Sequence, residues 1–122
     1  MTEPMAHALP VSLLDFIYQC IPTPQAAEVL LFFAGHPDRS FKPEDVVVAM
    51  RPLTITVPAV EEYIARFLES GLIATRPDGY AYHSASPAVE HAIGDLRSAY
   101  NKRPVTLIAA IHRIADNKIQ TE

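Results

Sequence analysis

The chain has 122 residues, of which 49% are apolar and 20% are charged, with eleven prolines and four glycines. This length fits one domain, and a chain of this size buries about two thirds of its unfolded surface, so its core needs no disulfide or bound metal. Ten lysines and arginines against fourteen aspartates and glutamates give a formal net charge of -4, which argues against a protein that is basic over its whole surface and holds nucleic acid by bulk charge.

Cysteine content and hydropathy bear on where the protein acts. The single cysteine, Cys20, cannot form an internal disulfide, and the N-terminus lacks the basic start and the cleavage site of a secretory signal. The longest uncharged stretches, residues 4–14 and 16–27, are shorter than the ~20 residues of a membrane-spanning helix, and prolines interrupt them. We therefore expect a cytoplasmic protein without membrane contact.

Two helices are predicted in the first third of the chain. Residues 1–9 show no periodicity and are expected to form a flexible tail. Residues 10–20 place their apolar side chains on one stripe of a helix, which the prolines just beyond it end. Thr23 and Pro24 then supply the cap and the first-turn residue of a second helix, which is apolar on nearly all sides and stops at Gly35. Such a helix needs burial on most of its surface.

The middle of the chain is predicted to contain a two-residue strand and two more helices. The strand is residues 40–41, and the third helix, residues 43–50, has acidic residues in its first turn, where the helix dipole favours negative charge. A tight connection leads to a fourth helix over residues 57–70, which Gly71 ends in the left-handed conformation. The apolar stripe of this fourth helix consists of Val60, Ile64, Phe67 and Leu68.

The last part of the chain is predicted to form a hairpin and two helices. The runs 72–75 and 80–83 flank a proline-aspartate-glycine turn, a pattern typical of a β-hairpin. One helix starts at Pro87 after the cap Ser86, and a final helix starts at Pro104. The wide apolar stripe of the final helix either covers the core or meets the same helix of a second copy in a two-fold dimer. The expected dimer interface consists of Leu107, Ile108, Ile111 and Ile114.

Three stretches of the sequence carry a resemblance to a known fold. They are the run from Phe41 to Val47, the helix from Val60 that closes with Leu-Glu-Ser-Gly-Leu-Ile, and the turn from Arg76 to Gly79. With the residues between them, they span about a third of the chain. They resemble a winged helix-turn-helix, and the chain is similar to the small bacterial regulators of the MarR, ArsR and PadR type.

The resemblance implies a fold class and a division of the chain. We expect a single domain over residues 1–122, mainly α with a small β-hairpin wing. Residues 10–35 would be its N-terminal helices, residues 41–83 the helix-turn-helix and wing, and residues 87–119 the C-terminal helices. The first and last helices would build a dimer.

The resemblance also implies a function, that of a DNA-binding transcriptional regulator acting as a homodimer. Its recognition helix enters the major groove of double-stranded DNA, while the wing touches the backbone or the minor groove. Hydroxyl and N–H groups at the start of the recognition helix suit phosphate oxygens, and an arginine further along suits a guanine edge. The expected DNA contacts are Arg51, Thr54, Thr56, Arg66 and, at the wing tip, Arg76.

The charge of the recognition helix leaves an alternative open. Residues 57–70 carry one arginine and three glutamates, a net charge of -2, so this helix gains nothing from counterion release. Glu62 and Arg66 stand four residues apart, and an ion pair along the helix explains them better than base contact. The alternative is a winged-helix protein-protein interaction module without DNA binding.

No catalytic residue, metal site or cofactor is predicted, because the common nucleophile, phosphate-loop and dinucleotide motifs are absent from the sequence. His91 with Asp95 and His112 with Asp116 have a spacing that hydrogen bonds on a helix surface explain more simply than a metal ion. Cys20 follows an apolar stripe and is expected to be a buried, inert thiol.

Overall fold

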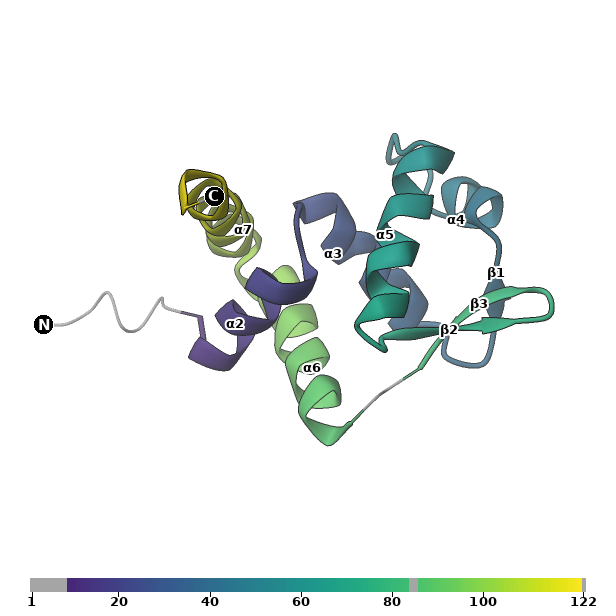
Figure 1. Cartoon of the computed structure of the whole chain (residues 1–122), viewed down its shortest axis with the longest axis horizontal. Coiled ribbons are helices and arrows are strands. Elements are labelled where there is room, and N and C mark those ends of the chain that lie inside the picture. Colours follow the sequence, from purple (N-terminus) through teal and green to yellow (C-terminus); the bar gives the residue numbers. More distant parts are fainter. Residues whose placement is uncertain (1–8, 84–85, 122) are drawn as a thin grey trace, which may run out of the picture.

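The computed structural model describes residues 9–83 and 86–121 and is shown in Figure 1. These residues form helices joined by short connections and a small antiparallel sheet, compatible with the predicted fold class. The helices are α2 (Val11–Cys20), α3 (Pro24–Ala34), α4 (Pro43–Ala49), α5 (Val57–Glu69), α6 (Pro87–Lys102) and α7 (Pro104–Thr121). The strands are β1 (Ser40–Phe41), β2 (Ile73–Arg76) and β3 (Gly79–Tyr82).

Three helices begin at a capping hydroxyl followed closely by proline. The side chains of Thr23, Thr56 and Ser86 accept hydrogen bonds from backbone N–H groups three residues later, at 3.0, 3.3 and 3.2 Å. A proline stands in the first turn of each of these helices, where its missing N–H costs nothing. The predicted starts of α3, α5 and α6 are therefore confirmed to the residue.

The sheet has the strand order β1-β3-β2, with all pairs antiparallel. Arg76 pairs with Gly79 across the two-residue turn, which confirms the predicted hairpin. Gly79 has a φ of 143°, and a Cβ atom there would lie 2.6 Å from the carbonyl carbon and oxygen of Phe41. Close approach of β1 therefore requires glycine at this position.

The core is one cluster of apolar side chains, with α3 at its centre. Figure 1 shows α2, α6 and α7 on one side of α3, and α4, α5 and the sheet on the other. Val29, Leu30 and Phe33 of α3 are completely buried, because α5, α6, α7 and β3 all contact this helix. This confirms that α3 is covered on most of its surface. Within residues 9–83 and 86–121, no helix combines the length and apolar character needed to cross a bilayer.

Several details differ from the sequence-based predictions. Leu9 is buried against the core, so it does not belong to a flexible tail, while residues 1–8 of that predicted tail lie outside the described residues. Tyr63 joins the buried stripe of α5, whereas Leu68 is only half-buried. Leu107 and Ile111 are each 1% exposed, because α7 packs against α2, α3 and α6. Leu107 and Ile111 therefore cover the core of their own chain, which is the first of the two arrangements expected for α7.

Candidate nucleic-acid interface

Helices α4 and α5 pack against each other and are joined by residues 50–56, as in a helix-turn-helix. The inner side of α5 carries Val60, Tyr63, Ile64 and Phe67, all buried. Its outer side carries Pro58, Glu61, Glu62, Ala65, Arg66 and Glu69, all exposed. The charged groups of this exposed side are three carboxylates and one guanidinium.

Three of the predicted DNA contacts lie in the connection between α4 and α5. Arg51, Thr54 and Thr56 are exposed and occupy the connection that precedes the helix. The Thr56 hydroxyl oxygen accepts the hydrogen bond from the N–H of Ala59, so its hydrogen remains available as a donor. Because Pro58 has no N–H and that of Ala59 is already used, Val57 alone of these first three helical residues keeps a backbone N–H for an anion. A phosphate contact here depends chiefly on the side chains.

A chain of hydrogen bonds fixes this connection to α3. The Tyr63 hydroxyl donates to Gln25 Oε1 at 3.3 Å, and Gln25 Nε2 donates to the Thr54 carbonyl at 3.1 Å. The Thr23 hydroxyl lies 2.9 Å from that of Tyr63. Sequence reasoning missed this network, although Tyr63 stands three residues after Val60, on the apolar stripe of the helix. The network positions the segment that carries Thr54.

Arg66 lies apart from the other predicted contacts. It belongs to the last turn of α5, ten residues after Thr56 and therefore ~15 Å further along the helix axis. It borders two grooves, one with Pro22 and Glu62 and one with Ile114 and Lys118 of α7. The expected ion pair between Glu62 and Arg66 is absent from the part of the chain that the structure describes.

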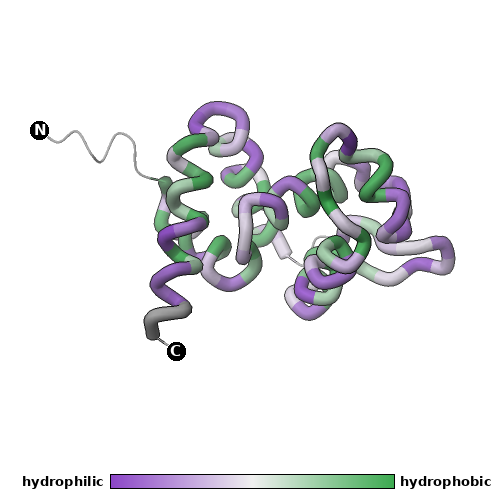
Figure 2. The backbone as a smooth tube through the Cα atoms, turned by 90° about the horizontal axis from the view of Figure 1, so that it is seen from above, coloured by the Kyte–Doolittle hydropathy of each residue, from purple (hydrophilic) through white to green (hydrophobic). Residues whose placement is uncertain are grey.

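Arg76 is exposed at the end of β2, beside the hairpin turn. The turn extends away from the body of the molecule in Figure 1 and forms the hydrophilic tip at the right of Figure 2. Among the described residues, nothing forms a hydrogen bond or ion pair with the guanidinium of Arg76. The hairpin turn therefore presents the guanidinium of Arg76, with the exposed carboxylate of Asp78 two residues further on.

The hairpin carries two tyrosines, Tyr80 and Tyr82, and each lies near a different helix. Tyr80 lies beside Ile64 and Leu68 of α5. Tyr82 donates a hydrogen bond from its hydroxyl to Glu90 Oε2 of α6 at 2.7 Å. Tyr82 therefore connects the sheet to α6 rather than to α5.

The remaining candidate sites include the His91–Asp95 pair and Cys20. His91 Nε2 lies 3.3 Å from Asp95 Oδ2, which agrees with a contact along the helix surface. No group of three or more histidine, cysteine or acidic side chains gathers as metal ligands within the described ranges. Cys20 is buried, and burial raises the pKa of its thiol above the ordinary 9.0, despite a hydrogen bond with Ser70 and the positive charges of Arg66 and Lys118. This environment suits the expected inert thiol.

The predicted dimer residues divide between core and surface. Leu107 and Ile111 are buried inside their own chain, and Ile114 is half-buried. Ile108 is 37% exposed, and Val105 on the same helix is 80% exposed. A second copy would therefore meet Ile108 and Val105 rather than the buried pair.

Comparison with known proteins does not identify the chain. No protein-family model matches it, and neither does a curated protein or a solved structure.

Proposed function

We propose that this chain is a transcriptional regulator that binds double-stranded DNA through a winged helix-turn-helix. The observation that carries the proposal is the placement of exposed polar groups around the α4–α5 pair. Arg51, Thr54 and Thr56 stand in the connection between α4 and α5, and Arg76 stands at the turn of a hairpin whose sheet has the order β1-β3-β2. Cations and hydroxyl donors at these places suit phosphate oxygens on either side of a groove.

In the proposed complex, α5 enters the major groove with its N-terminal end leading. Arg51 and the two threonine hydroxyls bind the backbone and set the register, while Arg76 binds a phosphate beside the groove. Arg66 stands at the other end of α5 and therefore contacts a base edge further along the groove. The network around Tyr63 keeps the leading end in place before DNA arrives, so less ordering is needed on binding.

The proposed regulator is a homodimer that places two α5 helices in successive major grooves. Support comes from the exposed apolar side chains Val105 and Ile108 on α7, next to a helix face that already covers the core. Two-fold symmetry then spaces two half-sites about one turn of DNA apart.

A second candidate function is a protein-protein interaction module that does not bind DNA. The exposed side of α5 favours it, because Glu61, Glu62 and Glu69 outnumber Arg66 and repel phosphates. A basic protein surface would complement this face better than DNA does.

A salt titration separates the two candidates. A fluorescent duplex from the region upstream of the protein's own gene, and an unrelated duplex of equal length, are titrated with the protein at several salt concentrations. A regulator gives a steep linear fall of log affinity against log salt and tighter binding to its own region. Weak binding that does not change with salt favours the interaction module.

A further inference from the structure

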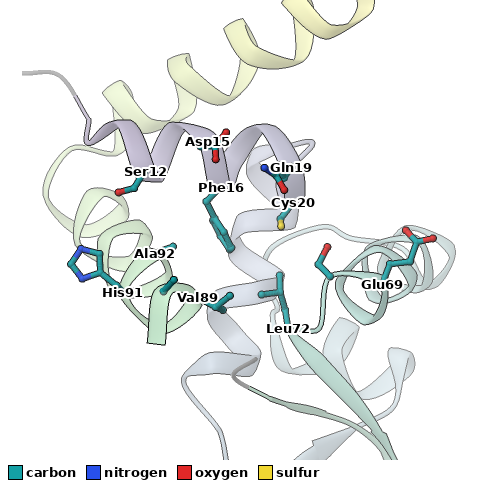
Figure 3. Close-up of a pocket in the computed structure, with 12 residues that line it drawn as sticks. Ser12, Asp15, Phe16, Gln19, Cys20, Glu69, Leu72, Val89, His91 and Ala92 are labelled. Atoms are coloured by element: carbon teal, nitrogen blue, oxygen red, sulfur yellow. The ribbon is translucent and has the colours of Figure 1, made fainter. Parts of the chain in front are cut away.

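A cavity of about 590 Å³ lies outside the proposed DNA interface, between α2, the C-terminal end of α5 and the first half of α6. Figure 3 shows side chains from these elements surrounding it. Its volume lies within the range of small-molecule sites, about 300 to 1,000 Å³. The size alone permits an organic ligand, and the lining decides its chemistry.

The inner wall of the cavity is apolar. Phe16 of α2 extends between the elements toward Val89 and Leu72 in Figure 3, and Ala92 completes this wall. Leu72 is 1% exposed and belongs to the core, whereas Phe16 and Val89 are half-buried and offer more apolar surface to a ligand. Cys20 also lines the cavity, and its raised pKa keeps the thiol neutral at physiological pH. The wall therefore favours a hydrocarbon or aromatic body.

The rim of the cavity carries negative charge. Asp15 of α2 and Glu69 of α5 line it from different elements, and both side chains are exposed. Across the described ranges, neither carboxylate makes a hydrogen bond or an ion pair. No lysine or arginine is among the lining residues, and His91, the remaining titratable neighbour, contacts Asp95 of its own helix. The positive charges of Arg66 and Lys118 act on Cys20, but neither residue lines the cavity, so an anion at the rim faces the carboxylates of Asp15 and Glu69.

We propose that this cavity binds a small organic cation with an apolar body, an aryl- or alkylammonium compound. The hydrocarbon part lies against Phe16, Leu72 and Val89, and the ammonium group remains at the rim between Asp15 and Glu69. Charge complementarity selects the cation, and burial of apolar surface supplies affinity. The site does not depend on the proposed DNA binding, since its occupation is measured without DNA.

The test compares three probes of nearly equal shape by NMR of the full chain: 2-phenylethylammonium, 2-phenylethanol and phenylacetate. Each is titrated to ~20 mM, a range that covers the affinity of a ligand with about ten non-hydrogen atoms. The methyl signals of Leu72, Val89 and Ala92 report the cavity, and those of Val105 on the exposed side of α7 are the reference. The expected result is saturable shifts at the cavity methyls, with the cation binding at least about threefold more tightly than the alcohol and phenylacetate weakest.

Variants separate charge from shape. Asp15→Asn combined with Glu69→Gln removes the preference for the cation but leaves the binding of the alcohol. Glu61→Gln neutralises a carboxylate of α5 outside this cavity and changes neither the preference for the cation nor the binding of the alcohol. Ala88→Phe places a ring into the cavity from its exposed edge and weakens all three probes.

Three results overturn the proposal. They are equal binding of the three probes, tightest binding of phenylacetate, and no cavity shifts with the cation at the highest concentration. Cavity shifts that depend on protein concentration without any probe also overturn it, because they indicate that a second copy of the chain occupies the cavity.

Discussion

The hydroxyl of Tyr63 on α5 lies 2.9 Å from the hydroxyl of Thr23, which caps α3 forty residues earlier in the chain. Thr23 Oγ1 accepts from the N–H of Ala26, and the Tyr63 hydrogen is directed to Gln25 Oε1, so the Thr23 hydrogen is the one shared with Tyr63. One tyrosine therefore joins the start of α3 to the middle of α5. This junction adds to the apolar packing that holds the helix we propose to read DNA.

Tyr63→Phe should lower the free energy of unfolding by ~1 kcal/mol, because it removes a partly buried hydroxyl from two hydrogen bonds without changing the shape of the ring. Urea denaturation followed by far-UV circular dichroism measures the change. Tyr80→Phe is the matched control, since its hydroxyl has no hydrogen-bond partner among the described residues. Equal effects of the two substitutions would show that the network does not stabilise the fold.

Gly79→Ala should be strongly destabilising, by roughly 2 to 4 kcal/mol, because the new Cβ would lie 2.6 Å from the Phe41 carbonyl group and the residue has a φ of 143°. Gly94→Ala is the control, since a Cβ there meets nothing within 4 Å and alanine favours a helix by about 0.5 to 1 kcal/mol. Thermal melts of both variants are compared with the unchanged chain. A small effect at Gly79, or a loss of stability at Gly94, would contradict the described packing.

Leu107→Ala and Ile108→Asp should affect different properties. Leu107 is buried, so its truncation should cost about 2 to 5 kcal/mol of stability and leave self-association of the folded fraction unchanged. Ile108 is partly exposed, so a carboxylate there should change stability little but prevent the proposed dimer from forming. Denaturation combined with light scattering separates the two effects. A wild-type chain that is monomeric at micromolar concentration would contradict the proposed dimer.

The stability of the fold should fall at alkaline pH, and Cys20 should account for part of the fall. Burial raises the pKa of its thiol above 9.0, so the unfolded chain loses this proton at a lower pH than the folded chain does. The contribution is constant below pH 9.0 and is lost as the pH rises further. Cys20→Ala should therefore give a shallower fall of the unfolding free energy above that pH.

The Cys20→Ala variant should still lose unfolding free energy at alkaline pH, and Tyr100 should account for part of that loss. The pKa of Tyr100 is raised above 10.0 by burial and by its hydrogen bond with Glu28. Tyr100→Phe is the matched variant, with an effect that begins at higher pH than that of Cys20. Slopes against pH are compared rather than absolute stabilities, because both substitutions also alter packing. Identical slopes in all three proteins would contradict this origin of the alkaline loss.

The sequence predicted the boundaries of the elements well because their causes are local. Thr23, Thr56 and Ser86 each precede a proline in a first helical turn, and that pattern defines a helix start wherever the helix packs. Gly71, with a φ of 75°, ends α5 for an equally local reason.

The surroundings of the same residues were harder to predict because they depend on contacts between distant segments. Apolar periodicity identified the stripe of α7, but only the packing of α2, α3 and α6 shows that Leu107 is inside while Ile108 is partly exposed. Similarly, a spacing of four residues permits a Glu62–Arg66 ion pair without requiring it. The Tyr63 network joins residues about forty positions apart, and no local pattern indicates such a contact.

The most direct test of the central claim is the salt dependence of duplex binding in three arginine variants. Each of Arg51→Ala and Arg76→Ala should reduce the slope of log affinity against log salt by ~0.9, the loss of about one phosphate contact. Arg113→Ala, which removes an exposed cation from α7, should leave the slope unchanged. If Arg51→Ala and Arg76→Ala both keep the slope of the unchanged chain, or if that chain shows no salt dependence at all, the start of α5 and the hairpin turn do not form a DNA-binding surface.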